Sequence, residues 1–124
     1  MDELSAQAKV HPRFRQSYDL RTTLEDKSQR MLNALEPGTI MPIHRHRNSS
    51  ESMVMVRGKL IERIYDDNCN LTKEFVMEPC GQYPMVQIEK GCWHSLEVLE
   101  EGTVIFESKD GAYEPLSNTD IMII

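Results

Sequence analysis

The sequence lacks any apolar run approaching the roughly 20 residues that a membrane-spanning helix needs. Its first ten residues, MDELSAQAKV, are polar and acidic at the start, which argues against a secretory signal. Basic residues are also few, with 14 Lys and Arg against 20 Asp and Glu and a formal net charge of −6. We therefore expect no general binding to nucleic acid or anionic membranes, which needs a basic face, although a local basic pocket stays open.

Cysteine is scarce and irregularly spaced, occurring only as Cys69, Cys80 and Cys92. An odd number of cysteines without a secretory signal predicts reduced thiols in a cytoplasmic protein. Because no CxxC-like pair is present, a zinc site built from cysteines alone is not expected. The thiol of Cys92 has only His11, in the N-terminal arm, left to activate it, so we interpret Cys92 as a small buried side chain.

The length of 124 residues predicts one structural domain with a core of its own. We divide it into an N-terminal helix and arm, residues 1–35, packed on a β-barrel formed by residues 36–124. Near the start, Leu4 and Ala8 repeat at helical spacing, and Pro12 should end this helix. The last part of the arm suits a loop leading into a strand, although its propensities suit a helix equally well.

From Glu36 onward, short apolar runs alternate with turn signals at intervals of about 8–12 residues, which is typical of an all-β sandwich or barrel. The predicted strands cover residues 39–44, 51–57, 59–65, 71–77, 84–88, 93–98 and 103–108. Tyr65 and Leu71 flank a polar turn and predict a hairpin. The end of the chain, YEPLSNTDIMII, predicts an irregular tail that packs back on the barrel or on a partner subunit.

Two histidines lie one residue apart, and His44 and His46 on an extended strand would project from the same face. Glu51 follows a short turn and begins the next strand, and His94 begins a later one. Three neutral imidazoles and one carboxylate suit divalent iron, manganese, zinc, nickel or cobalt at about 2.0–2.2 Å. Each residue alone also has an ordinary explanation, as a surface histidine, a solvated edge charge or a buried histidine.

The spacing of these residues matches a named pattern. The first cupin motif is reproduced at every fixed position: Gly38, five residues, His44, one residue, His46, four residues, Glu51, six residues and Gly58.

The second cupin motif is recognisable but imperfect. Gly91 and His94 match it with the expected two residues between them. Glu89 stands where a proline is expected, Val98 replaces an asparagine, and Gly81 lies two residues too far upstream. These departures affect turns and strand packing, and the ligand position is retained.

Several segments resemble the WbuC family of cupin-fold metalloproteins along nearly the whole chain: DELSAQA, SQRMLNALEPGT, HRH and GCWHSLEVLEEGTVIFESKDGAY. That family is small, bacterial and often associated with O-antigen and other surface-polysaccharide gene clusters. The resemblance implies a single-domain jelly-roll β-barrel that binds one divalent transition metal ion (Fe, Mn, Zn, Ni or Co). Its ligands would fall on His44, His46, Glu51 and His94. A small-molecule ligand is expected, and a homodimer, because small cupins commonly pair through sheet edges or swapped arms.

Inward-facing side chains near the ion would form the pocket, and we select Arg30, Asn33, Arg57 and Tyr83 as substrate-binding candidates. The guanidinium of Arg30 suits a carboxylate or phosphate. Arg57 has the alternative of capping its strand end. Two groups fall outside the pocket: Met53 and Met55 are interpreted as core filler, and Arg45 and Arg47 as solvated residues opposite the ligand face.

Three functions remain open. The first is a metal-dependent enzyme of isomerase or epimerase type, acting on a sugar or nucleotide-sugar in surface-polysaccharide synthesis. The second is an iron-dependent dioxygenase. The third is a non-catalytic module whose metal anchors a ligand, since no proton-transfer residue beyond the ligands is evident. A metal-free epimerase is disfavoured, because it needs a His–Asp pair and three of the four histidines are assigned to the metal.

Overall fold

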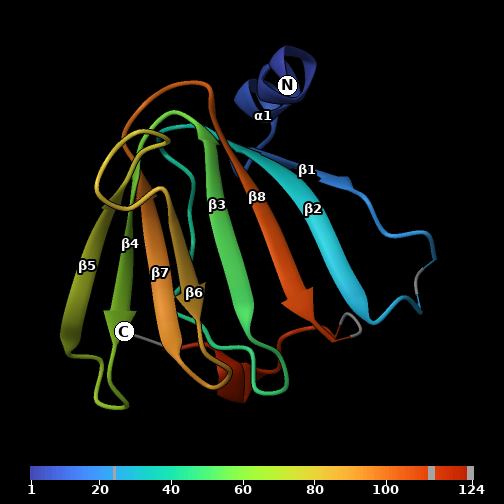
Figure 1. Ribbon diagram of the computed structural model, residues 1–124. Helices are drawn as coiled ribbons and strands as arrows, with labels where there is room; N and C mark the ends of the chain where they lie inside the picture. Colours follow the sequence, from blue (N-terminus) through green and yellow to red (C-terminus); the bar gives the residue numbers. More distant parts are fainter. Residues whose placement is uncertain (24, 112–113, 123–124) are drawn as a thin grey trace.

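The computed structural model describes residues 1–23, 25–111 and 114–122, which form one α-helix, eight strands and a short 3-10 helix (Figure 1). The elements are α1 (Asp2–Val10), β1 (Arg15–Asp19), β2 (Ser28–Leu35), β3 (Glu51–Arg57), β4 (Leu60–Tyr65), β5 (Leu71–Met77), β6 (Met85–Ile88), β7 (Trp93–Val98), β8 (Thr103–Asp110) and η1 (Asn118–Asp120). In this part of the chain, every helix is too short or too polar to cross a membrane.

The strands form two antiparallel sheets, one of five strands in the order β1-β2-β8-β3-β6 and one of three in the order β5-β4-β7. One hydrophobic core joins them, with Met53 and Ile105 from the larger sheet and Leu60 and Met77 from the smaller. The small all-β jelly-roll barrel predicted from the sequence is confirmed. The hairpin of β4 and β5 is confirmed as well, with Tyr65 opposite Leu71.

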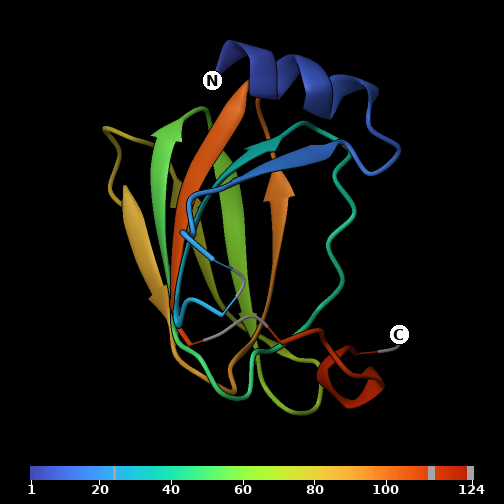
Figure 2. The same cartoon turned by 90° about the vertical axis from the view of Figure 1, so that its right-hand side faces the viewer.

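The helix α1 lies near one end of the barrel, and η1 lies near the opposite end (Figures 1 and 2). The helix ends at Val10, as Pro12 predicts, and its Ala8 packs with Ala34 and Val104 in a small second core on the outer face of β2 and β8. The sheet itself begins at Arg15, inside the range that the sequence assigns to the arm. The segment with ambiguous propensity is a strand, β2.

The predicted strand at 39–44 is wrong as a continuous element. Only His44 makes β-bridges there, one to His94 and one to Ile121. A proline at position 42 has no amide hydrogen to donate, so a regular ladder cannot run through this segment. The consequence is that the first metal-ligand candidates lie on an irregular segment between defined strands.

Candidate metal centre

The segment that carries His44 and His46 is held by backbone hydrogen bonds to the region around β7. The amide of His44 donates to the carbonyl of His94 at 3.0 Å, and the amide of His94 donates back at 2.8 Å. The amide of Gly91 donates to the carbonyl of His46 at 2.8 Å. These bonds bring His94 beside the HxH pair, although the two lie far apart in the sequence.

The C-terminal segment holds the other side of the same stretch. The amide of Arg45 donates to the carbonyl of Asp120 at 3.0 Å, and the amide of Met122 donates to the carbonyl of Ile43 at 2.8 Å. The tail therefore packs back on the barrel, as predicted, within the part of it that the structure describes.

Arg47 is exposed, as predicted, whereas Arg45 is only partly exposed, and both are more than solvated side chains. Both guanidinium groups pair with Asp120, at 3.3 Å for Arg45 and 2.5 Å for Arg47. The guanidinium of Arg45 also lies 4.4 Å from the ring centroid of Trp93, in a cation–π contact. These contacts join the segment that carries His44 and His46 to the C-terminal segment through Asp120 and to β7 through Trp93.

The imidazoles of His44, His46 and His94 converge at the base of a cavity. One ring nitrogen from each lies within 4.8 Å of the others. The carboxylate oxygen Oε2 of Glu51 lies 3.7 Å from Nε2 of His46 and 3.7 Å from Nε2 of His94. Two ligands about 2.1 Å from one ion lie at most about 4.2 Å apart, so the widest nitrogen separation needs to close by less than about 1 Å.

Hydrogen bonds on the far side of two rings leave their Nε2 atoms available to a metal. Nδ1 of His44 lies 2.9 Å from the carbonyl of Pro42, which can only accept, so Nδ1 carries the proton. Nδ1 of His94 lies 2.6 Å from Oε1 of Glu62, whose side chain is fully buried on β4. Carboxylates and carbonyls in this position orient metal-binding histidines and select their tautomer.

Two buried polar atoms face the centre of this group without a hydrogen-bond partner among the described residues: Oε2 of Glu51 and Nε2 of His94. Leaving a buried polar atom unpaired costs about 1–3 kcal/mol, so such atoms are rare unless another group satisfies them. A divalent cation between them would satisfy both. The donor set therefore fits a transition metal.

Burial keeps the three histidines neutral at pH 7. It is the main cause that lowers the pKa of His44 to about 4, of His46 to about 3 and of His94 to about 4. Protonated His94 would repel a proton on His44 and so lowers the pKa of His44 further. The positive charge of Lys109 lowers the pKa of His46 in the same way. Metal binding requires neutral imidazoles, so these ligands need not lose a proton at pH 7.

The neighbouring carboxyl groups behave in the opposite way. Burial raises the pKa of Glu51 and raises that of Glu62 well above its ordinary value. Burial, reinforced by the charge of Glu51, raises the pKa of Glu107 to about 7. A bound divalent cation would favour the ionised carboxylates and counter these shifts.

Glu107, on β8, lines the cavity together with Glu51. Asn33 donates to its Oε1 at 3.0 Å, and Nζ of Lys109 lies 3.8 Å from its Oε2. Asn33 in turn hydrogen bonds to the hydroxyl of Ser17 on β1. A carboxyl group with a pKa near 7 beside a candidate metal ligand is a group that can hold or release a proton at neutral pH.

The titration of Glu107 should appear in the stability of the metal-free protein. Its pKa is about 7 in the folded protein and ordinarily 4.5, so its contribution to stability is fully present below about pH 4.5 and is lost as the pH rises through 7. Relative to Glu107→Gln, the wild-type free energy of unfolding should therefore fall by about 1.4 kcal/mol per pH unit between these limits. Urea unfolding with a chelator at pH 5, 6, 7 and 8 measures the difference. A difference independent of pH would contradict it.

The cavity has a volume of about 260 Å³. It shares lining residues with a second, neighbouring hollow of about 480 Å³, which we call the outer hollow. The outer hollow lies between the 46–49 loop, the end of β8 and the C-terminal segment. Three cations line the inner cavity: Arg13, Arg15 and Lys109. Glu51 and Glu107 line it too, so the cavity combines cations with carboxyl groups in a chain whose formal charge is −6.

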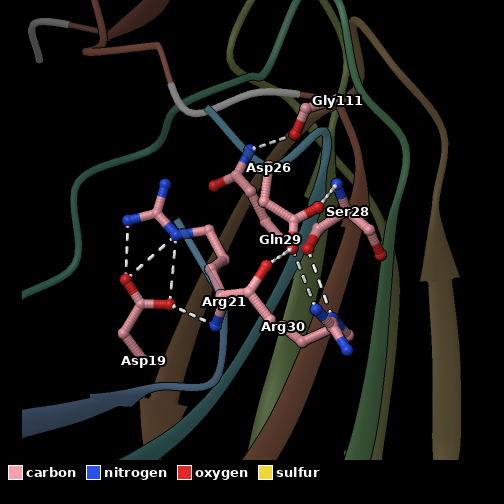
Figure 3. A network of polar contacts seen from close by, with 8 residues as sticks. Asp19, Arg21, Asp26, Ser28, Gln29, Arg30 and Gly111 are labelled. Carbon is pink, nitrogen blue, oxygen red and sulfur yellow. Dashed lines mark hydrogen bonds and ion pairs between the residues drawn. The ribbon is translucent and has the colours of Figure 1, made fainter. Parts of the chain in front are cut away.

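Of the four predicted pocket residues, the structure brings only Asn33 into the cavity. Arg30 lies on the opposite face of β2, where its guanidinium pairs with Asp26 at 3.0 Å (Figure 3). Alternation along the strand explains this placement, because Gln29, Met31 and Asn33 face the cavity.

The other two candidates lie elsewhere. Arg57 follows a register shift in β3, and its guanidinium bonds to Asp2 at 2.6 Å and to Ser5 at 2.9 Å on α1. The ring of Tyr83 packs against Phe75, with centroids 5.0 Å apart, beside the core. Met53 and Met55 are core residues, as interpreted, although Met53 also lines the cavity.

Sequence reasoning missed Arg13 and Arg15 and four residues nearer the histidines: Gln29, Glu62, Glu107 and Lys109. Alternation in β8 contained a signal for two of them, since Glu107 and Lys109 share the face of the buried Ile105. The same rule places Glu62 with Leu60 on the buried face of β4. Charged residues at apolar positions of a strand indicate a polar site inside the barrel.

Over residues 1–77 the chain matches the family model described as Domain of unknown function (DUF6016). None of the curated proteins compared with it matches. Among solved structures it is similar to the capsular polysaccharide assembling protein CapF of Staphylococcus aureus, with 24% identity and a TM-score of 0.70 over 86% of this chain and 28% of that one. The chain therefore spans less than a third of CapF.

Two further structures are similar in fold. An oxalate oxidase in complex with glycolate is 16% identical, with a TM-score of 0.68 over 88% of this chain and 57% of that one. The cupin domain of Schizosaccharomyces pombe Cnp3 is 12% identical, with a TM-score of 0.63 over 78% of this chain and 64% of that one. These likenesses show a cupin fold.

Proposed function

The chain belongs to the DUF6016 family, and we propose that it is a metal-binding cupin whose ion is held by His44, His46, Glu51 and His94. The observation that carries this proposal is the convergence of the three imidazoles and the Glu51 carboxylate on one buried point, where two polar atoms have no partner among the described residues. Four protein ligands would leave one position open for a ligand in five-coordinate geometry and two in octahedral geometry, and catalytic metals keep such open positions.

We propose that the ligand is a small polar metabolite, such as a sugar or nucleotide-sugar in bacterial surface-polysaccharide (O-antigen) metabolism. The sequence resemblance to the WbuC family supports this assignment, and the likeness in fold to a capsular polysaccharide assembling protein agrees with it. Asn33 is retained as a substrate-binding candidate because it lines the cavity.

For an enzyme of isomerase or epimerase type, the bound ion would supply Lewis-acid polarisation of a ligand oxygen. Glu107 would hold or accept the proton that such a reaction moves, at a carboxyl oxygen kept in place by Asn33. The fully buried Glu62 would fix the orientation of His94. A proton-transfer group beyond the ligands, which the sequence analysis had not selected, thus favours catalysis over passive binding.

An iron-dependent oxygenase is the second candidate, since three histidines and a carboxylate with open positions also support oxygen chemistry. The likeness in fold to an oxalate oxidase keeps this candidate open. Oxygen uptake after anaerobic loading with ferrous iron would favour it over isomerisation. A non-catalytic ligand-binding module would show ligand binding without either activity.

Three further features belong to the proposal. We expect one structural domain, in which the segment predicted as helix and arm, residues 1–35, also supplies β1 and β2 to the sheet that residues 36–124 complete. We expect a homodimer, which sedimentation at micromolar concentration would test. We expect a cytoplasmic protein, because the three cysteines are free thiols in the structure and such thiols persist in a reducing compartment.

Metal analysis of protein purified without added metal tests the central claim. We expect about one divalent transition metal ion per chain, because the site has four ligands of the kind that such ions prefer. The variant His11→Ala is the matched control, since His11 lies outside the site and its Nδ1 accepts from the amide of Arg13 at 3.0 Å. A wild-type protein that takes up none of the five candidate metals after dialysis would contradict the proposal.

A further inference from the structure

A row of three polar side chains crosses neighbouring strands of the larger sheet beside the candidate metal centre. Gln29 on β2 lies directly opposite Lys109 on β8, and Lys109 lies directly opposite Glu51 on β3. Residues opposite one another on antiparallel strands project from the same face, about 5 Å apart. Lys109 is therefore the neighbour of Glu51 on β8, as Ile88 is on β6, and the amide of Gln29 lies one strand further from Glu51, beside Lys109.

The amide of Gln29 presents an unpaired acceptor. The side chain is only 4% exposed, and its Nε2 donates to the carbonyl of Gly111 at 2.9 Å (Figure 3). Since a carbonyl can only accept, this bond fixes which end of the amide is nitrogen. The remaining atom, Oε1, is buried and has no hydrogen-bond partner among the described residues. A hydroxyl group on a ligand would satisfy it by donating.

The ammonium group of Lys109 is incompletely paired. The side chain is 13% exposed, and the ion pair that the structure gives it is with Oε2 of Glu107, at 3.8 Å. This distance is too long for a hydrogen bond, so the ammonium group can donate to water or to a ligand that enters the cavity. A carboxylate on a ligand would accept from Nζ at normal distance, and it would separate the ammonium group from a divalent ion in the same cavity.

The two residues also stand at the boundary between the two spaces. Gln29 and Lys109, together with His46 and Leu116, line both the inner cavity and the outer hollow. Both residues therefore lie where the two spaces adjoin. The inner cavity of about 260 Å³ admits only a small ligand, or the end of a larger one.

We infer that Gln29 and Lys109 form a subsite for the acidic end of a small hydroxy acid bound at the metal, with Lys109 binding its carboxylate and Gln29 its hydroxyl group. A monoanion matches the single ammonium group better than a phosphate dianion does. This inference rests on the proposed metal site and narrows its ligand to an acid.

The test compares lactate with lactamide, which share size and hydroxyl group and differ in charge. The wild-type protein loaded with Co²⁺ is titrated with each, and the visible absorption of the ion reports binding. Lactate should bind at least about tenfold more tightly than lactamide, a preference worth about 1.4 kcal/mol. Lys109→Met should abolish the preference for lactate over lactamide. Gln29→Met should lower the affinity for lactate several-fold.

Arg30→Met is the matched control, because it removes a cation from the residue next to Gln29 on the outer face of β2 (Figure 3). It should leave both affinities unchanged. Equal binding of lactate and lactamide by the Co²⁺-loaded wild type would overturn the subsite alone, and it needs no variant to fold. Tighter binding of inorganic phosphate than of lactate would overturn the assignment to a carboxylate. Failure to bind Co²⁺ would overturn the metal site and the subsite together.

Discussion

Replacing His94 by alanine is expected to lower the affinity for a divalent metal by about a hundredfold to a thousandfold. Structural zinc sites with four protein ligands bind with roughly 10–16 kcal/mol, so one ligand is worth about 2.5–4 kcal/mol. His94 is also the partner of Glu62 at 2.6 Å, and its removal leaves a fully buried carboxyl group without that contact. Competition against a chromophoric chelator measures the loss.

The effects of neighbouring variants should follow a graded order. Glu62→Gln keeps His94 and removes only the charge behind it, and loss of such a partner costs about tenfold to a hundredfold in affinity. His11→Ala should bind metal as the wild type does. Thermal melting in chelator shows whether His94→Ala is folded. A folded His94→Ala protein with wild-type affinity would remove His94 from the ligand set.

Gly58→Ala is expected to destabilise the protein by about 4 kcal/mol, because positive φ and overpacking each cost roughly 1–3 kcal/mol. The backbone of Gly58 has φ of +86°, which residues with a side chain rarely adopt. A Cβ atom there would lie 2.3 Å from Oγ1 and 2.6 Å from Cα of Thr103, and the second of these is backbone that cannot rotate away. Urea unfolding measures the change, and the melting temperature should fall by more than about 10 °C.

Gly91→Ala separates the two causes. Gly91 also has positive φ, at +79°, but a Cβ atom there would meet nothing within 4 Å. Only the backbone preference is lost, so the expected cost is about 1 kcal/mol. If both variants were equally destabilised, the contact with Thr103 would not be the cause. Gly58 is the last fixed position of the first cupin motif, so the comparison gives that motif position a physical reason.

The sequence predicted the barrel well, because most strands combine apolar residues with clear turn signals. Six of the seven strands predicted after Glu36 are present, with bounds that differ by at most two residues. The exception, 39–44, failed because its apolar residues belong to an irregular segment held by β7 and the C-terminal segment. Neither contact is visible in the local sequence.

The pocket was predicted less well than the convergence of histidines, for two physical reasons. In β2 both faces are covered, one by α1 and one by the cavity, so no polar alternation tells which of Gln29 and Arg30 points inward. In β3 a register shift between Met55 and Arg57 breaks the alternation that placed Arg57 in the pocket. Spacing within the local sequence predicted the candidate metal ligands. Which other residues line the cavity depends on the pairing of strands that are distant in the sequence.

The bridges of His44 to His94 and to Ile121 have a consequence for the order of folding. Both partners lie far along the chain, so closing them requires large loops to be ordered first, and such contacts form late. The same segment has no continuous ladder of its own and is therefore expected to open before the sheets do. A metal ion would then enter and leave through this local opening, and its exchange rate would be set by the C-terminal segment and not by global unfolding.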